Sequence, residues 1–322
     1  MTGNAAADRL PPEAPLGKLL RPAPGPPRLV PGLPLTLGYT LFYLSVLVLI
    51  PLAGMVFETM HLSWSEFWET VSDPIVVASY KLTFTASAAA AAVNGIFGLI
   101  VAWVLVREPF PGRRVFDALI DLPFALPTAV AGITFSSLYL PENWIGGFGR
   151  HLAEFINRLA GFAGLGEILP SDALSWLNFP YSNTNAGIVL VLIFVGLPFV
   201  VRTVQPVLQE WDTENEHAAL SLGANQWTIF RRVIFPEIFP AWISGLALAF
   251  ARGIGEYGSV IFIAGNIPGK SQIAPLQIVT KLDDFRTAQA TAIGIVLLFF
   301  AFLILLGING IEWWARRRER VS

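Results

Sequence analysis

Residues 216–236 read EHAALSLGANQWTIFRRVIFP, a polar and interrupted segment set between two strongly apolar ones. Within it, Ala218-Ala219 is followed after three residues by Gly223, and after nine more by Val233-Ile234-Phe235-Pro236. Alanine favours a helix, glycine adopts the left-handed conformation that ends one, Asn225 can cap the next, and proline is accepted in the first turn of a helix. The stretch therefore predicts a short helix, a break and a second helix that leads into an apolar segment.

The whole chain has the composition of a membrane protein. Of its 322 residues 54% are hydrophobic and 14% are charged, and its mean hydropathy is +0.60. Soluble proteins carry about 25% charged residues, and an apolar segment of about 20 residues is long enough to cross a bilayer. We therefore predict an all-α integral membrane protein with six transmembrane helices. The six segments are Leu35–Phe57, Leu82–Val106, Leu122–Leu140, Ala186–Val201 with an extension to 208, Pro240–Phe262 and Thr287–Ile311.

The distribution of basic residues predicts the orientation. With the N-terminus in the cytoplasm, 14 of the 21 Lys and Arg residues fall in inner segments and one, Arg252, lies in a span. The other six fall in outer segments: Lys81, Arg150, Arg158, Lys270, Lys281 and Arg286. Cytoplasmic loops carry the excess of basic residues, so both termini and residues 216–236 are expected in the cytoplasm. The expected location is the cytoplasmic (inner) membrane, crossed several times.

Three segments outside the spans have a distinct composition. Residues 1–34 are proline-rich and predict an extended cytoplasmic tail, and residues 316–322 form a basic cytoplasmic C-terminus. The transmembrane domain is expected between them, over residues 35–315. The outer segment 141–185 is the longest loop, and apolar residues at helical spacing predict an amphipathic helix over residues 151–162.

The fifth predicted span contains an ionisable pair. Arg252 and Glu256 are four residues apart, which places them on one face of a helix where they can pair. Gly245, Ala249 and Gly253 form a second face of small residues that lets another helix approach. A charge at membrane depth costs about 2.5–3.5 kcal/mol or more. The pair therefore has two possible roles, to fix helix packing or to line or gate a translocation path.

The segment 216–236 resembles the loop by which permeases of ATP-binding-cassette (ABC) importers dock onto an ATPase. That pattern is Glu-Ala-Ala, three residues, Gly, nine residues, then Ile-x-Leu-Pro. The resemblance implies a docking loop at about 209–238. In this sequence His217 stands at the Glu position, and Val233 and Phe235 replace Ile and Leu. The residues to which the resemblance assigns docking are Glu216, His217, Ala218, Ala219, Gly223 and Pro236.

The pattern Arg252-x-x-Gly-Glu256-Tyr-Gly258 is similar to the signature of oxyanion importer permeases. Residues 110–132 and 259–285 look like the T-subunit permeases of sulfate/thiosulfate importers, a likeness that covers most of 35–315. It implies a type I importer fold and a heterodimer with a second, W-type permease. It also implies two ATPase subunits and an extracytoplasmic sulfate-binding protein. ATP and Mg²⁺ would bind the ATPase, and this chain would carry no cofactor. Molybdate/tungstate permeases are the alternative, although they are shorter and lack the extended 265–285 loop.

The residues that carry catalysis or metal binding in enzymes are sparse. The chain has no Cys, and His61, His151 and His217 all fall in loops. Asp117 and Asp121 lie at the inner edge of the third span, and Gly269-Lys270-Ser271 lacks the first glycine of a phosphate-binding loop. We therefore predict no catalytic residue, no metal site and no nucleic-acid partner. An intramembrane enzyme and a proton-coupled transporter that uses Glu256 are the remote alternatives.

Overall fold

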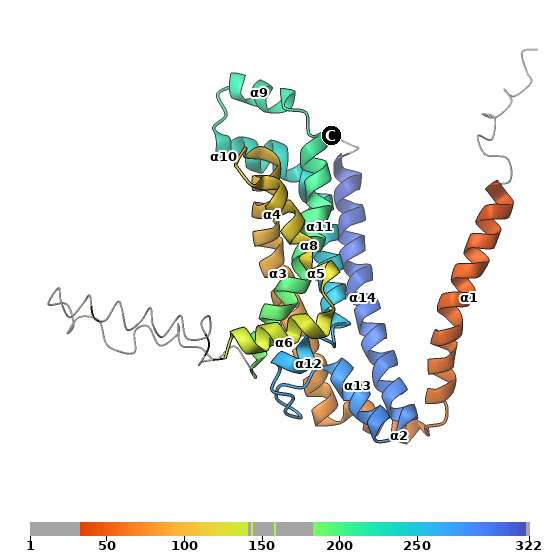
Figure 1. The fold of residues 1–322 in the computed structure, drawn as a ribbon. Helices are drawn as coiled ribbons and strands as arrows, with labels where there is room; N and C mark the ends of the chain where they lie inside the picture. The colour runs from red at the N-terminus through yellow and green to blue at the C-terminus, as the bar shows by residue number, and fades with distance from the viewer. Residues whose placement is uncertain (1–32, 141–142, 144–157, 159–182, 320–322) are drawn as a thin grey trace, which may run out of the picture. The chain divides into compact units, whose positions relative to one another are not determined.

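The computed structural model describes residues 33–140, 143, 158 and 183–319, and every element within them is a helix (Figure 1). The chain divides into two units after Ala53. The first contains the greater part of α1 (Leu33–Thr59), an unbroken apolar helix. The second holds the end of α1 and the other helices. They are α2 (Trp64–Ser72), α3 (Pro74–Arg107), α4 (Arg113–Ile120), α5 (Leu122–Ala125), α6 (Thr128–Leu138), α8 (Asn185–Glu210), α9 (Glu214–Ser221), α10 (Gln226–Ile229), the π-helical turn η3 (Phe230–Ile234), α11 (Phe235–Ile254), α12 (Val260–Ile263), α13 (Ala274–Asp283) and α14 (Thr287–Glu319).

Five helical stretches in the described chain are long and apolar enough to cross a membrane. They are Leu35–Thr59, Pro74–Arg107, Asn185–Glu210, Gln226–Ile254 and Thr287–Gly310. The first, second, fourth and sixth predicted spans are therefore confirmed as helices. The second begins earlier than predicted, since Asp73 accepts a hydrogen bond from the Ile75 N–H and Pro74 opens α3.

The third predicted span, Leu122–Leu140, is not one continuous helix, and this part of the prediction is wrong. The helix stops at Leu126, whose backbone is extended, and resumes after Pro127. The ring of a proline disfavours helical geometry in the residue before it, which explains the break. The remaining helix, α6, has 11 residues and is about 16 Å long, too short to cross the hydrocarbon core alone.

The fifth predicted span, Pro240–Phe262, lies further towards the C-terminus than the helix that forms there. Its helix α11 begins at Phe235 and ends at Ile254, and Gly255 follows as its cap. The glycine-rich stretch up to Gly258 then separates α11 from the short helix α12. Apolar composition continued across this stretch, so the hydropathy pattern did not reveal where the helix ends.

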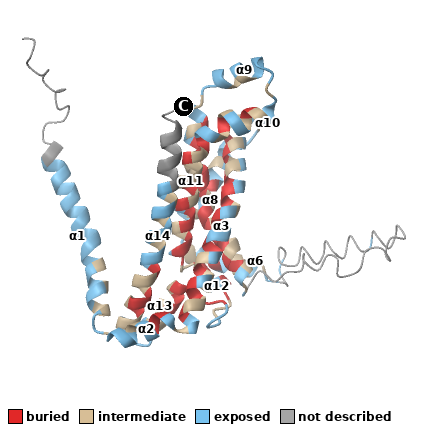
Figure 2. Cartoon of the chain, turned by 180° about the vertical axis from the view of Figure 1, so that it is seen from behind, coloured by how far each residue is buried: buried red, intermediate tan, exposed pale blue. Residues whose placement is uncertain are grey.

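Helices α3, α8 and α11 form the packed centre of the second unit. Glycines let them approach, because a Cβ at Gly98 would stand 2.9 Å from the side chain of Val200 on α8. The small-residue face of α11 is confirmed: Gly245 packs against α8 at Thr203, and Gly253 against Ser87 on α3. The Trp242 indole N–H also donates to the Gly95 carbonyl at 2.8 Å. Buried residues therefore concentrate where these three helices meet (Figure 2).

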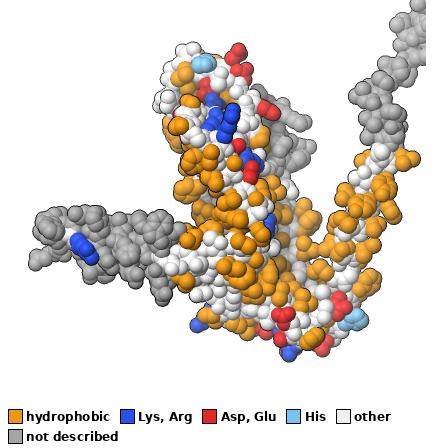
Figure 3. All heavy atoms as spheres, in the orientation of Figure 1, with side chains coloured by type: hydrophobic (Ala, Val, Ile, Leu, Met, Phe, Trp, Pro, Cys, Tyr) orange, Lys and Arg blue, Asp and Glu red, His pale blue; other side chains and the backbone are white. Residues whose placement is uncertain are grey.

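The outer surface of the second unit is apolar along its middle and charged towards its ends. On the face in Figure 3, charged side chains gather near α9 and near α2, with hydrophobic side chains between. Large apolar residues of α3 and α14, such as Phe97 and Phe302, are more than half exposed. Such surfaces are stable against lipid or against another subunit.

Several predictions concern residues that the structure does not describe. The proline-rich tail lies outside the described residues as far as residue 32, and its last two residues begin α1. The amphipathic helix predicted over 151–162 also lies outside them, apart from Arg158. The basic segment 316–322 is described as far as Glu319, where α14 ends.

Candidate functional site

The segment singled out in the sequence forms two short helices separated by a turn. Helix α9 ends at Ser221, and Gly223 has a left-handed φ of 81°. Asn225 caps α10, since its side-chain oxygen accepts a hydrogen bond from the Thr228 N–H at 2.8 Å. The predicted helix, left-handed glycine and asparagine cap are therefore present. The segment lies at one end of the second unit, and α2, α12 and α13 lie at the other (Figure 1).

The six residues assigned to docking do not share one face. His217 and Ala218 are exposed, whereas Ala219 is half-buried and packs on the core. Glu216 is also half-buried, and its carboxylate lies 2.7 Å from the Arg107 guanidinium at the end of α3. Glu216 thus contacts this chain's own membrane helix. The structure brings His217 and Ala218 to the exposed side.

Two leucines that were not predicted also stand on this exposed side. Leu222 is 89% exposed and Leu220 is 49% exposed, although both belong to a polar segment. The two side chains therefore add exposed apolar surface to the end of α9. The available sequence signal was the presence of two leucines among otherwise polar or small residues.

Helix α11 is joined to α10 through the π-helical turn η3. In this turn the N–H of Phe235 bonds to the Phe230 carbonyl, and Pro236 follows in the first turn of α11. A wider turn leaves room for a proline, whose nitrogen has no hydrogen to donate. Pro236 therefore lies where the segment 216–236 enters the long apolar helix α11, as the sequence pattern predicted.

A second polar cluster connects α4 and the start of α5 to α8. Arg202 of α8 donates to Asp117 at 2.7 Å and to both carboxylate oxygens of Asp121, at 2.8 and 2.6 Å. Gln205 joins them through a 3.2 Å hydrogen bond to Asp117. A pair of carboxylates can serve an enzyme as acid and base, but Asp117 and Asp121 both bind the same arginine, Arg202. The hydrogen bond from Arg202 lowers the pKa of Asp117, which favours an ionised carboxylate rather than a proton donor.

Arg252 and Glu256 pair as predicted, but they do not share a helix face, because α11 ends at Ile254 and Glu256 follows its cap. The two side chains are 2.5 Å apart, with Glu256 buried and Arg252 about 35% exposed. Glu256 also accepts hydrogen bonds from the Ser259 N–H at 3.0 Å and the Ser259 hydroxyl at 2.7 Å. The carboxylate therefore connects the last turn of α11 to the start of α12. Ser259 was not predicted, because its role depends on where the helix breaks.

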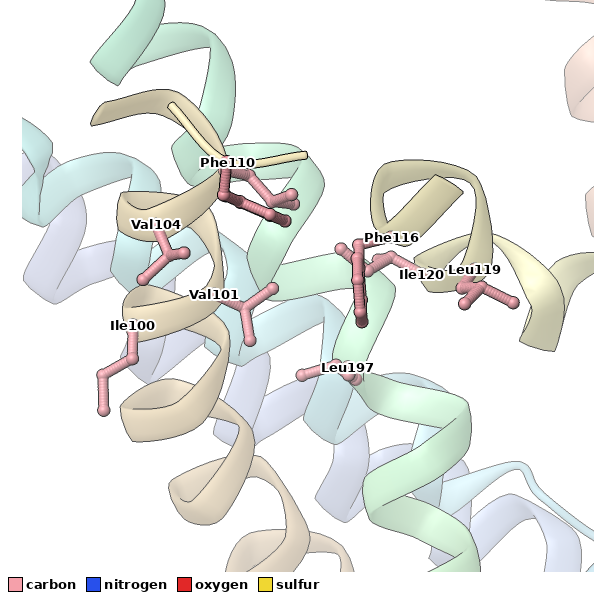
Figure 4. Close-up of a pocket in the computed structure, with 9 residues that line it drawn as sticks. Ile100, Val101, Val104, Phe110, Phe116, Leu119, Ile120 and Leu197 are labelled. Carbon is pink, nitrogen blue, oxygen red and sulfur yellow. The ribbon is translucent and has the colours of Figure 1, made fainter. Parts of the chain in front are cut away.

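The cavity beside α4, next to the Asp117 cluster, is unsuited to an anion. This cavity of about 450 Å³ lies between α3, α4 and α8 (Figure 4). Its walls are entirely apolar: Ile100, Val101, Val104, Leu105, Phe110, Phe116, Leu119, Ile120 and Leu197. Within the described residues, no three His, Asp or Glu side chains gather as a metal site would require. Gly269-Lys270-Ser271 forms a tight turn, in which the N–H groups of Lys270 and Ser271 bond to the Ile267 carbonyl.

The Asp117–Arg202 contact predicts a dependence of stability on pH. Because the pKa of Asp117 is lower in the folded chain, its contribution is complete above the ordinary value of 3.8 and disappears as pH falls below it. Asp117→Asn should lower the thermal midpoint at pH 7. The midpoint of this variant should then fall less between about pH 5 and pH 3 than that of the unmodified chain. The effect should not exceed about 1 kcal/mol, since water reaches side chains that are 31% and 40% exposed.

Thermal unfolding of the detergent-solubilised chain, measured across this pH range, tests the Asp117 prediction. Asp284→Asn is the matched control, because Asp284 is exposed. Equal acid sensitivity in the Asp117→Asn variant and the unmodified chain would contradict it.

The Arg252–Glu256 pair predicts strong coupling between two substitutions. Arg252→Gln should cost about 3 kcal/mol, since it leaves a buried carboxylate whose remaining hydrogen bonds, in the described part of the chain, come from Ser259. Arg252→Gln with Glu256→Gln should recover stability relative to Arg252→Gln alone, with an interaction free energy of about 1 kcal/mol or more. A double-mutant cycle on thermal unfolding measures this quantity. Simple additivity of the two changes would refute the pairing.

Comparison with known proteins agrees with this architecture. Residues 94–317 match the family described as "Binding-protein-dependent transport system inner membrane component". The chain is 43% identical over 285 residues to the sulfate transport system permease protein CysT of Salmonella typhimurium, covering 88% of this chain and 94% of that one. It is 41% identical over 278 residues to CysT of Synechocystis sp., with 86% and 88% covered. These relatives are named as permeases rather than as enzymes.

Solved structures show the same fold at low sequence identity. A chain of a bacterial ABC transporter involved in the import of alginate aligns with a TM-score of 0.63 at 15% identity, covering 87% of this chain and 94% of that chain. A chain of the MetNI methionine ABC transporter aligns with a TM-score of 0.52 at 15% identity, covering 79% and 99%. The predicted fold of a type I ABC importer permease is confirmed. The chain belongs to the family of binding-protein-dependent transport system inner membrane components.

Proposed function

We propose that this chain is the permease subunit of an ATP-driven importer of sulfate and thiosulfate. The observation that carries the proposal is the 43% identity to a sulfate transport permease across 88% of the chain. A tetrahedral dianion cannot cross hydrocarbon without compensation of its charge, so it needs an enclosed path between protein helices. This chain supplies half of that path, and a second permease of the W type supplies the other half.

In the proposed assembly the energy comes from partner subunits. Two ATPase subunits bind ATP and Mg²⁺ on the cytoplasmic side, and a sulfate-binding protein delivers the anion from outside. Both termini of this chain lie in the cytoplasm, and the membrane is the cytoplasmic one. The excess of basic residues in the inner segments supports this orientation. The exposed apolar residues along α3 and α14 support burial against lipid or the second permease.

The segment of α9 and α10 is the proposed docking site for the ATPase. Its exposed surface contains His217, Ala218, Leu220 and Leu222, and Gly223 sets the turn that presents them. The two leucines provide apolar contact area, and Ala218 lets a partner backbone come close. His217 occupies the position at which the family pattern has Glu, so the contact made here would differ from that of an acidic side chain.

Arg252 and Glu256 have a combined role in this proposal. Glu256 holds the junction of α11 and α12 through Ser259 and Arg252. The exposed part of the Arg252 guanidinium would be costly against lipid, so it should face water in the path or the second permease. Glu256 thus fixes the packing of the helix junction, and Arg252 places a positive charge along the proposed path.

Uptake of labelled sulfate tests the proposed function. Deleting this chain from the cell that produces it should abolish ATP-dependent sulfate uptake and leave molybdate uptake near normal at low concentration. Restoring the full chain should restore sulfate uptake. Loss of molybdate uptake with sulfate uptake retained would assign the chain to the molybdate/tungstate permeases. Uptake driven by a pH gradient without any ATPase would favour proton-coupled transport instead.

A substitution at Gly223 tests the docking site. A Cβ here would meet no atom within 4 Å, so the effect of a side chain is on the backbone alone. A left-handed conformation costs ordinary residues about 1–2 kcal/mol, whereas Asn adopts it more easily. Gly223→Val should raise the ATP hydrolysed per sulfate imported by the reconstituted complex, and Gly223→Asn should stay close to the unmodified chain. Normal coupling in Gly223→Val would place the ATPase contact elsewhere.

A further inference from the structure

One ion pair joins the proposed docking helix to a membrane helix. Within the described residues, Arg107–Glu216 is the ion pair that connects α9 to another element. The Nη2 atom of Arg107 donates to Glu216 Oε1 at 2.7 Å. Both side chains are mostly shielded from water, with 19% and 21% of their surface exposed. A charge-assisted hydrogen bond in this setting is stronger than the usual surface pair.

Aromatic side chains fix the position of Arg107. Its guanidinium carbon lies 5.3 Å from the centre of the Trp103 ring, one turn earlier on α3. Trp103 in turn contacts Phe230 edge-on, with ring centres 5.6 Å apart, and Phe230 stacks on Trp227 at 5.7 Å. These rings belong to α3 and to the α10–η3 segment. Trp103 therefore contacts the arginine directly, and the rings of the α10–η3 segment pack on Trp103.

The docking helix has few other attachments. None of the residues of α9 is buried, and its N-cap residue Thr213 makes no side-chain capping bond. Ala219 of α9 and Ala224, which follows the helix, are half-buried and pack against the core. The position of α9 thus depends strongly on the bond from Glu216 to Arg107.

Helix α3 extends from this ion pair to the opposite end of the second unit. It has 34 residues and is therefore about 50 Å long. Near its far end, Thr83 accepts a hydrogen bond from the Ala274 N–H of α13 at 2.9 Å, and the Tyr80 hydroxyl donates to the Ile293 carbonyl of α14 at 3.1 Å. A displacement of the inner end of α3 would therefore act on α13 and α14 (Figure 1).

We propose that Arg107 is a positioning residue that locks the docking helix α9 to α3, so that movement of α9 is passed along α3 to the outer end of the chain. The inference rests on the proposed docking role of α9. It gives Glu216 an intramolecular function, distinct from the ATPase contact that the sequence pattern assigned to it. It also separates the docking segment into an exposed face that meets the partner and an inner face that transmits its movement.

The first test measures the position of α9 in the isolated full chain. Because the sequence has no Cys, spin labels can be attached at Glu108→Cys and Ser221→Cys alone. Pulsed electron paramagnetic resonance should give one narrow distance distribution for the labelled chain that keeps Arg107 and Glu216. The labelled Arg107→Glu variant should give a broad or displaced distribution, because two acidic groups then face each other. Arg107→Glu with Glu216→Arg restores opposite charges and should restore the narrow distribution.

Two further variants control this measurement. Arg114→Glu makes the same change of charge at an exposed arginine of α4 and should leave the distribution unchanged. Arg107→Gln removes the charge without introducing repulsion and serves if Arg107→Glu fails to fold. An unchanged distribution in both Arg107→Glu and Arg107→Gln would overturn the positioning role.

The second test measures coupling in the complex reconstituted with its permease, ATPase and binding-protein partners. Sulfate imported per ATP hydrolysed should fall about fivefold or more in Arg107→Glu, the scale of typical coupling between sites. It should return to within about twofold of the unmodified complex in the exchanged pair, and Arg107→Lys should be intermediate because it keeps the charge. Normal coupling in Arg107→Glu would overturn the inference, and so would a failure of the exchanged pair to recover coupling. Neither result would contradict the proposed import of sulfate.

The two tests separate this inference from the proposed function. If the unmodified complex imports no sulfate, the proposed substrate is wrong, and the distance measurement alone decides whether Arg107 positions α9. If sulfate is imported and the distances do not respond to Arg107, the function stands and the inference fails.

Discussion

The close approach of α3, α8 and α11 is the constraint on which the rest of the second unit depends. In a bilayer, apolar side chains gain little by leaving lipid for protein, so helices associate through contact of their backbones and side chains. Gly98, Gly245 and Gly253 permit that contact because a Cβ at each would press on a neighbouring helix. The three helices form the fixed body against which the broken and short elements are placed.

The interrupted helices put polar groups at positions that an unbroken helix could not supply. The break at Pro127 separates α6 from α5, and a Cβ at Gly132 in α6 would clash with the backbone of Ser259. Ser259 in turn binds Glu256, whose carboxylate also meets Arg252. Two breaks from distant parts of the sequence thus support one another. An importer path needs polar groups at membrane depth, and non-helical backbone is tolerated there only when protein or water covers it.

At the end of the second unit that carries α9, arginines connect the short helices to the long ones. Arg202 binds Asp117 and Asp121 and fixes α4 and α5 to α8, while Arg107 binds Glu216 and fixes α9 to α3. The guanidinium group suits this work because it is always charged and presents several donors in a plane. In the proposed assembly, movement received from the ATPase would reach the long helices through such contacts.

The sequence by itself determined the membrane class, four of the six spans, the small-residue face of α11 and the local form of the docking segment. These follow from properties of single segments: apolar length, glycine in a left-handed turn, and Asn225 as a cap. Tertiary structure decided what depends on neighbours. Pro127 divided a segment whose composition reads as one span, and Glu216 turned towards Arg107, a residue 109 positions earlier in the chain. Hydropathy and spacing describe one segment at a time, whereas a hydrogen bond or an ion pair depends on which distant residue the fold brings within 3 Å.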